Sequence, residues 1–317
     1  MEIFTGADLK GNETGIMTNN HILSVSLGSS ERNHCTTEWL EGKKYTVERR
    51  GVDGDKKRAI ELIQAMDGRV AAFGLGGTDL YIYAGNRRYR FYEAAQIAKA
   101  AVKSPLVDGS GIKNTLERRV LTYLEQTGFS FQGKKVLLVC AVDRFGLAEA
   151  FVQAGCQVVF GDLLFGLGWP VPIRSLKTLA RLAFFLAPII TKLPVGWFYP
   201  MGKAQIESKP RYSRFFEEAD IIAGDFHFIR RYMPLKLAGK LILTNTVTQD
   251  DLALLAARGA ATVVTTTPSM GGRSFGTNIL EALLVAHSGR WPKALTPLEY
   301  LELMERLQIQ PRIVHLS

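Results

Sequence analysis

The stretch Gly133–Asp162 reads GKKVLLVCAVDRFGLAEAFVQAGCQVVFGD. Its unbroken apolar run Val136–Ala141 predicts a buried strand, and a short polar segment, residues 142–146, follows it. Apolar residues then recur at three-to-four spacing up to Gly155, which predicts a helix, and Val158–Phe160 is a second apolar run. A strand, a helix and a strand within about 30 residues have the size of a βαβ crossover. The sequence therefore predicts an α/β fold with a Rossmann-like, doubly wound parallel sheet.

The turn of this crossover departs from the dinucleotide fingerprint G-x-G-x-x-G. Only the last glycine, Gly146, is kept, and Asp143 replaces the glycine that lets backbone approach a pyrophosphate. Arg144 could supply positive charge instead, and Asp162 stands where such folds place the carboxylate that binds the ribose. Two interpretations stay open: a dinucleotide-binding turn, or a plain α/β sheet in which Asp143 caps the helix.

Composition narrows the classes of function. The 317 residues carry a net charge of +9, which favours acidic ligands such as phosphates or an anionic membrane surface. Basic residues occur in scattered pairs without a nucleic-acid-binding motif, so we expect no nucleic-acid partner. The three cysteines match neither a disulfide framework nor a zinc site, and no metal site is expected. Because no secretory signal is recognisable, the expected location is the cytoplasm, peripheral to a membrane if the chain binds one.

The order of expected elements suggests a division of the chain. Strands at 21–27, 44–49 and 70–75, helices at 56–66 and 92–102, and a hairpin around residues 84–86 define an N-terminal α/β half. The loops 28–34 and 74–79 are rich in small residues and could approach a ligand. The expected organisation has four parts: a flexible leader, 1–20; a smaller α/β substrate domain, 21–112; a Rossmann-like domain, 113–290, with an apolar insertion, 163–210; and a peripheral helix and tail, 291–317.

Polar residues gather where the two halves should meet. Asp108, Lys113 and Asn114 lie at the start of a long helix expected at 114–127, and ligands often bind at such seams. Asn114 could instead cap the helix, and Lys113 could be a solvated surface residue.

The segment after a strand expected at 219–224 also carries chemistry. His227 is the best candidate for general acid–base work, because its ordinary pKa lies near neutrality. Arg230 and Arg231 could bind a carboxylate or phosphate of the substrate, and Asp225 would share a strand face with His227 if the strand continued. The alternative is a salt-bridged loop at the edge of the sheet.

The last expected strand, 262–266, leads into a loop of Gly, Ser and Arg and then a helix at 279–287. Such an arrangement is a natural anion site, although it is no Walker A loop. The candidate substrate contacts here are Ser269, Gly271, Gly272 and Asn278.

The residues Lys113-Asn114-Thr115, the long helix, and the lead GFSFQGKK into the crossover carry a family resemblance. The chain resembles shikimate/quinate dehydrogenases over roughly residues 106–286, and more closely a group of bacterial quinate 5-dehydrogenase-like proteins. This resemblance implies an NAD(P)-dependent oxidoreductase acting on a hydroxyl or carbonyl group. NAD is slightly preferred, because Asp162 would repel the 2′-phosphate of NADP. The family's aspartate is Leu116 here and its catalytic lysine motif is missing, so Lys113 and Asp108 are the chemical substitutes.

The combined hypothesis assigns the sites as follows. The catalytic candidates are His227, Lys113 and Asp108. The cofactor-binding candidates are Asp143, Arg144, Phe145, Gly146, Asp162, Thr246 and Thr266. The substrate-binding candidates are Asn114, Arg230, Arg231, Ser269, Gly271, Gly272 and Asn278. The alternative hypothesis is a non-redox Rossmann-like protein that binds another phosphorylated or acidic ligand.

The apolar segment 163–201 fits the resemblance least. A helix is expected at 175–186, with Arg174, Lys177 and Arg181 on one side and Pro188 breaking or kinking it. Three interpretations stay open: a core or homodimer-interface helix pair, a lid over an apolar substrate, and an interfacial membrane anchor that includes Trp197 and Phe198.

Overall fold

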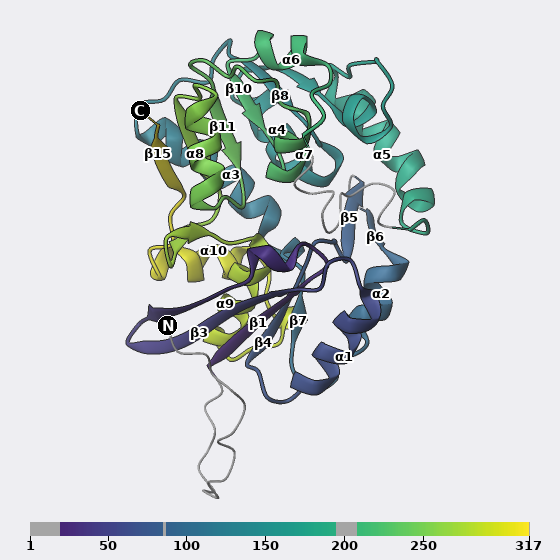
Figure 1. Cartoon of the computed structure of the whole chain (residues 1–317), viewed down its shortest axis with the longest axis vertical. Helices are drawn as coiled ribbons and strands as arrows, with labels where there is room; N and C mark the ends of the chain where they lie inside the picture. Colours follow the sequence, from purple (N-terminus) through teal and green to yellow (C-terminus); the bar gives the residue numbers. More distant parts are fainter. Residues whose placement is uncertain (1–19, 85–86, 195–207, 317) are drawn as a thin grey trace, which may run out of the picture.

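The chain forms two α/β units, one above the other in Figure 1 and each built on a mainly parallel sheet, hereafter the N-terminal and C-terminal layers. This computed structural model describes residues 20–84, 87–194 and 208–316. The expected leader before Asn20, the tip of the hairpin at residues 85–86, and Trp197 and Phe198 lie outside the described residues. The α/β class and the doubly wound parallel sheet are confirmed.

The N-terminal sheet has the strand order β2-β3-β1-β4-β7. β1 pairs in parallel with β3 and β4, and β2 runs antiparallel to β3. The bounds of these strands are β1 (His21–Ser26), β2 (His34–Leu40), β3 (Lys43–Gly51), β4 (Ala72–Gly76) and β7 (Leu106–Val107). β2 was not expected, since it was read in part as loop. It joins β3 through Glu41 and Gly42, which both have positive φ (46° and 76°), as tight hairpins require.

The C-terminal sheet has the order β15-β12-β11-β10-β8-β9, with only β15 antiparallel among the described strands. Its strands are β8 (Lys135–Leu138), β9 (Gln157–Phe160), β10 (Ile221–Ala223), β11 (Leu241–Thr244), β12 (Thr262–Thr265) and β15 (Arg312–His315). β9 lies on one side of β8, and the following strand β10 lies on its other side, so the order of strands reverses between β8 and β10. Open α/β sheets bind ligands at such a reversal of strand order. The expected tail after residue 306 therefore contributes a sheet strand instead, because β15 pairs with β12.

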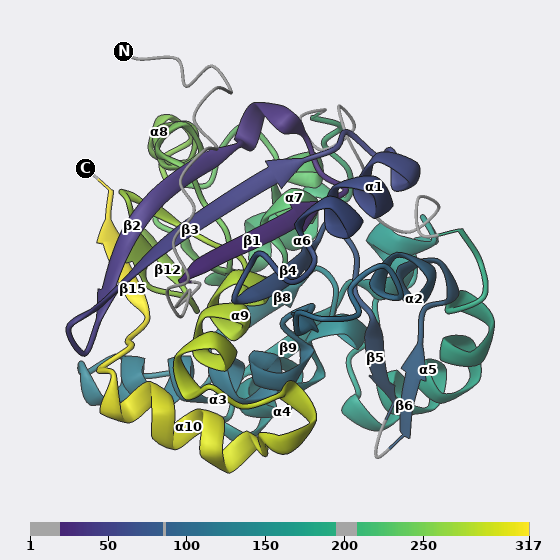
Figure 2. The same ribbon diagram turned by 90° about the horizontal axis from the view of Figure 1, so that it is seen from below.

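Helices cover both faces of each sheet, as the buried clusters and Figures 1 and 2 show. The helices are α1 (Lys56–Met66), α2 (Tyr92–Ala98), α3 (Ser110–Gln126), α4 (Phe145–Gln153), α5 (Leu176–Ile190), α6 (Ser213–Glu218), α7 (Phe226–Tyr232), α8 (Gln249–Ala257), α9 (Thr277–Ser288) and α10 (Pro297–Arg306). α3 connects the layers: Ile112 and Leu116 pack into the N-terminal core, and Val120 and Leu124 pack into the C-terminal core. This four-residue spacing keeps one helix face buried from end to end.

The chain returns to the N-terminal sheet after β12. The buried side chains of α9 and α10, including Leu280 and Tyr300, pack in one cluster with β1 and β4. Gly74 of β4 allows this approach, because a Cβ there would lie 2.9 Å from the backbone oxygen of Asn278. The expected boundaries at 290 and 291 are therefore wrong in space, since α9 and α10 both complete the N-terminal layer.

The apolar insertion packs between the layers. α5 begins at its cap Ser175 and runs past Pro188 to Ile190, two residues beyond the expected kink. Ala183 and Ala187 are buried against the N-terminal core, and the helix lies beside the hairpin β5 (Tyr81–Ala84) and β6 (Arg87–Arg90) in Figure 2. Over the described residues, no helix combines the length and apolarity needed to cross a membrane.

Candidate functional site

A polar cleft of about 120 Å³ lies between the two layers, where strands of both sheets end. Cations and acids from both layers line it: Arg32, Arg49, Asp79, Lys113, Asp143, Arg144, Asp225, His227 and Arg273. Since such a volume exceeds that of a single water, the cleft can hold a small polar molecule.

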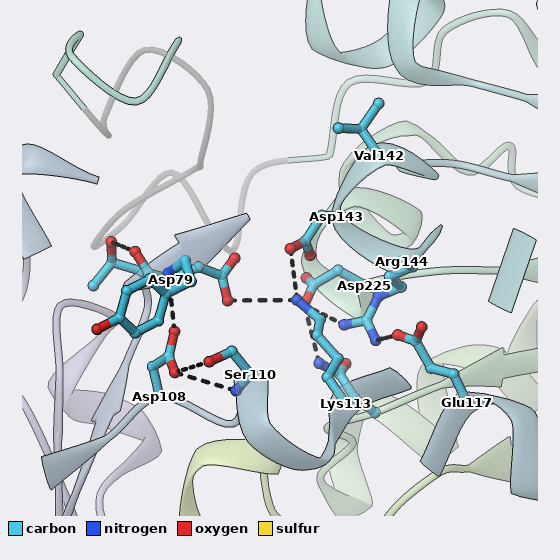
Figure 3. A network of polar contacts seen from close by, with 12 residues as sticks. Asp79, Asp108, Ser110, Lys113, Glu117, Val142, Asp143, Arg144 and Asp225 are labelled. Atoms are coloured by element: carbon cyan, nitrogen blue, oxygen red, sulfur yellow. Dashed lines mark hydrogen bonds and ion pairs between the residues drawn. The ribbon is translucent and has the colours of Figure 1, made fainter. Parts of the chain in front are cut away.

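Lys113 lies in the first turn of α3 and connects the layers across this cleft (Figure 3). Its Nζ donates to Asp143 at 2.6 Å and to Asp79 at 3.4 Å. Burial opposes the charged form of Lys113, but Asp143 and Asp79 outweigh it and raise the pKa of the ammonium group above its ordinary value. The raised pKa favours the ammonium form, so Lys113 is better suited to stabilising negative charge than to moving a proton.

Asp79 and Asp143 titrate as a pair, and their pKa values shift in opposite directions. Burial and the charge of Asp143 raise the pKa of Asp79 to about 8, so its carboxyl group keeps a proton at neutral pH. Burial opposes ionisation of Asp143 as well, but Lys113 and Arg144 lower its pKa below the ordinary value. The three-residue group, hereafter the Lys113 cluster, thus contains one cation, one anion and one neutral acid.

The glycine loop after β4 places Asp79. Gly77 has a φ of +70°, and a Cβ there would lie 2.7 Å from the backbone nitrogen of Gly28. Only glycine allows the two loops to pass so closely. Gly76, Gly77, Thr78 and Asp79 all line the cleft, so this loop does approach the candidate ligand site.

His227 lies at the start of α7, because β10 ends at Ala223 and the strand does not continue. The cap of α7 is Asp225, whose carboxylate accepts from the backbone nitrogen of His227 at 2.9 Å. Burial, followed by the charges of Arg32, lowers the pKa of His227 to about 4. The imidazole is neutral at physiological pH, and among the described residues its Nδ1 has no hydrogen-bond partner.

The helix of the crossover already carries an anion at its N-terminus. Glu117 of α3 accepts from the backbone nitrogen of Leu147 at 3.1 Å and from Arg144 at 3.0 Å. Arg144 is only 3% exposed and also pairs with Asp225 at 3.5 Å. Gly146 permits this packing, because a Cβ there would lie 2.9 Å from the side chain of Asn114. Arg144 therefore lines the cleft while its guanidinium group is held by two carboxylates of the protein.

The turn itself is also occupied. Asp162 accepts from the backbone nitrogens of Ala141 and Val142 at 3.0 and 2.8 Å. These are donors that a dinucleotide diphosphate would need, and burial raises the pKa of Asp162 to about 6. Asp143 adds a further negative charge. The residues of this turn do not fit a diphosphate, and Asp143, Arg144 and Asp162 make protein contacts instead of the expected cofactor contacts.

Of the remaining cofactor candidates, one lines the cleft and two are buried or partly buried elsewhere. Phe145 packs partly buried against the C-terminal core, and Thr246 lines the cleft. Thr266 is 2% exposed, and its Oγ1 has no hydrogen-bond partner among the described residues. An apolar cavity of about 90 Å³ adjoins the turn and is lined by Cys140, Asp162 and the inner side of α5.

Several substrate candidates lie outside the cleft. Arg230 pairs with Asp251 at 2.8 Å and Arg231 lies over the ring of Tyr232, and neither residue lines the cleft. Both belong to α7, which begins at Phe226, directly after its cap Asp225. The loop residues Ser269, Gly271 and Gly272 belong to the tight hairpin of β13 (Ser269–Met270) and β14 (Arg273–Ser274). Their expected position in the site is wrong.

The last three candidates lie in or beside the cleft. Asp108 lines it, and its carboxylate also accepts from the backbone nitrogen of Leu80 at 2.5 Å and from Ser110, so it fixes the loop before α3. Asn114 packs against Gly146 beside the main cleft. Asn278 lines the cleft and donates to Ser24 at 2.9 Å.

Four charged residues of the cleft were not expected there. Arg32 and Asp79 come from the two small-residue loops whose backbone was thought to meet a ligand. Arg49 lies two residues before the end of β3, and Arg273 follows the Gly271-Gly272 turn. The only sequence signal was their place in, or next to, those loops and strand ends.

Comparisons with known proteins give the following. Solved structures with similar chains include a Mycobacterium smegmatis protein in complex with β-D-fucofuranose (11% identity, 94% of this chain and 99% of that chain, TM-score 0.33). Others are glutamate dehydrogenase from Thermus thermophilus (12%, 92% and 74%, 0.43) and NAD-dependent malic enzyme from Thermotoga maritima (12%, 78% and 65%, 0.30). At these scores the similarity carries no argument about function. Among curated proteins, none matches the chain.

Two families match the chain itself. "Domain of unknown function (DUF8753)" matches residues 21–108, and "Domain of unknown function (DUF8754)" matches residues 111–316. Because the second match covers more than half of the 317 residues, the chain belongs to the DUF8754 family.

Proposed function

We propose that the cleft is the active site of an enzyme that moves a proton on a small acid bearing a hydroxyl or carbonyl group. The observation that carries the proposal is the Lys113 cluster, in which the ammonium group bridges two carboxyl groups in the cleft between the layers. Perturbed titratable groups concentrated in a cleft are typical of active sites.

The chemistry follows from the charge state of each group. Asp79 keeps a proton up to a pH of about 8 and can donate it to a substrate oxygen. Lys113 stays cationic and can stabilise negative charge that develops on that oxygen. Asp143 holds the ammonium group in position at 2.6 Å.

His227 supplies the complementary role. It lines the same cleft, is neutral at physiological pH, and has an Nδ1 without a partner among the described residues. A neutral imidazole can accept a proton from a substrate carbon or hydroxyl, while Asp79 delivers one. Two groups whose pKa values are shifted in opposite senses mark an acid and a base.

Proton exchange with solvent tests this proposal without knowledge of the full reaction. The chain is incubated in D₂O with a panel of small hydroxy and keto acids, and proton NMR follows loss of substrate signals. Exchange with at least one compound is expected, and Asp79→Asn and Lys113→Met should abolish it. The matched surface variants Asp250→Asn and Lys57→Met should retain it. Exchange that survives Asp79→Asn and Lys113→Met would sink the proposal.

An NAD(P)-dependent oxidoreductase of the shikimate/quinate dehydrogenase type is the second candidate. The cleft lies at the strand-order reversal between β8 and β10, where α/β dehydrogenases bind their ligands, and this position supports it. The filled turn at Ala141 and Val142 speaks against it. Oxidation of NADH or NADPH by any keto acid of the panel, followed by absorbance, would favour this candidate over the first.

A further inference from the structure

Three arginines from segments far apart in the sequence line the cleft: Arg32, Arg49 and Arg273. Arg273 Nη1 donates to the backbone oxygen of Arg32 at 2.9 Å, which brings the two residues into contact. Burial, then Arg32 and Arg273, lower the pKa of Arg49 to about 9. Burial, then Arg32, lower the pKa of Arg273 to about 10. The three like charges therefore repel one another in a partly desolvated place.

Their compensation within the protein is incomplete. Asp251 pairs with Arg32 at 3.2 Å, but the same carboxylate also pairs with Arg230 at 2.8 Å on the outside of the cleft. Asp53 adds an attraction to Arg49, and the guanidinium group of Arg273 lies over the ring of Phe275. Among the described residues, however, Asp251 is the only carboxylate that forms a direct ion pair with one of the three arginines. A bound anion would stabilise this local excess of positive charge.

Arg273 carries donors to which the described residues offer no acceptor. Its side chain is 7% exposed, and its Nε and Nη2 have no hydrogen-bond partner among the described residues. Buried donors without an acceptor are rare, because they lose their hydrogen bonds to water. Arg49, by contrast, is held in place by Ser29 and Ser26 at 3.0 Å each. The site is preorganised, with donors left over.

We propose that Arg32, Arg49 and Arg273 bind a doubly charged oxyanion of the substrate, either a phosphate monoester or a pair of carboxylates on one molecule. Guanidinium groups match such oxyanions with paired, charge-assisted hydrogen bonds. The inference rests on the proposed function, since it names the substrate class of the same cleft.

Anion binding has a consequence for the candidate base. The charges of Arg32 and Arg49 contribute to the low pKa of His227. A bound dianion offsets these charges, so the pKa of the imidazole rises toward its ordinary value of about 6.5. The substrate's own charged group would thereby make His227 a better base at neutral pH.

Calorimetric titration of the full chain with inorganic phosphate, malonate and acetate tests the inference. Phosphate or malonate should bind saturably, and at least about tenfold more tightly than the monoanion acetate. The stronger of the two identifies the phosphate monoester or the dicarboxylate. Arg273→Gln and Arg49→Gln should each weaken binding by about tenfold or more, while the exposed Arg118→Gln should change it less than about twofold.

Thermal melts check that the variants are folded. If Arg273→Gln is unfolded, the inference is tested by the anion affinity of Arg49→Gln and by NMR titration of His227. The pKa of His227 should then be higher with phosphate than without it. Equal binding of all three anions, or equal effects of Arg49→Gln and Arg118→Gln, overturns the inference. Lys113→Met should keep anion binding but lose proton exchange. Loss of anion binding alone therefore refutes the inference, and absence of Lys113-dependent exchange alone refutes the proposed function.

Discussion

Replacing Lys113 by methionine should destabilise the protein in a strongly pH-dependent way. The Lys113–Asp143 attraction at 2.6 Å is worth about 6 kcal/mol at an effective dielectric constant of about 20. The variant no longer has to bury the charged ammonium group of Lys113, which offsets part of this attraction. The net loss of unfolding free energy at pH 8 should therefore be about 4 kcal/mol. At lower pH, the unpaired Asp143 of the variant can lose its charge by binding a proton. This costs about 1.4 kcal/mol for each pH unit above the ordinary pKa of about 3.9. At about pH 5.5 the loss should therefore be near 2 kcal/mol.

Urea unfolding, followed by tryptophan fluorescence at the two pH values, measures this effect. Lys57→Met, an exposed lysine of α1, should change the free energy of unfolding by less than about 0.5 kcal/mol. The double variant Lys113→Met with Asp143→Asn should recover more than half of the loss, because no buried charge is left alone. A loss below about 1 kcal/mol at pH 8, or one that does not shrink at the lower pH, would refute the assigned charge states.

Three further predictions concern other parts of the chain. Arg144→Met should cost about 3–5 kcal/mol of unfolding free energy, since it leaves the buried Glu117 unpaired, and adding Glu117→Gln should restore part of it in the same urea assay. A native Asp79 pKa of about 8 means that the folded chain keeps a proton which the unfolded chain releases, so stability falls as the pH rises from about 4 to about 8. Asp79→Asn should remove this decline, and identical pH profiles of both proteins would contradict it. The helix α5 exposes Phe185 (70%) and Ile189 (57%) near Lys177 and Arg181, so the expected membrane-surface contact predicts co-sedimentation with phosphatidylglycerol vesicles but not with phosphatidylcholine vesicles. Phe185→Ser should reduce it without lowering the melting temperature, and equal sedimentation with both lipids would count against this surface.

The buried parts of the fold could be predicted from the sequence. The crossover strands β8 and β9 are covered on both faces, so each is a continuous apolar run that stands out from its surroundings. β2 and β15 were missed because they are edge strands with mixed, half-exposed residues. α9 was placed in the wrong layer, since amphipathic periodicity shows that a helix is buried but not against which sheet.

The site was only partly predictable for a similar reason. The loops 28–34 and 74–79 were recognised as approaching a ligand, and they supply Arg32 and Asp79. Their convergence with Arg273, 241 residues beyond Arg32, depends on the packing of the two layers and has no local signal. Arg230 was misplaced because the chain turns into α7 directly after Asp225, which changes the direction of every later side chain.

The crossover keeps the strand, turn and helix of a dinucleotide-binding motif, but protein carboxylates occupy the backbone donors of its turn. Gly146 has a structural role that needs no cofactor, because a Cβ there would lie 2.9 Å from the side chain of Asn114 in α3. Asp162 occupies backbone donors of the turn, and Glu117 occupies the N-terminus of α4. The protein's own carboxylates thus stand where phosphate oxygens would bind in a dinucleotide fold.

The central claim is that ligands bind in the polar cleft and that no dinucleotide binds at the filled turn. Fluorescence titration of the chain with NADH and NADPH tests it most directly. The account predicts no saturable signal for either nucleotide up to about 1 mM, the range of weak binding. A saturable signal with a Kd in the micromolar range would contradict it, because Asp162 would then have to leave the backbone of Ala141 and Val142.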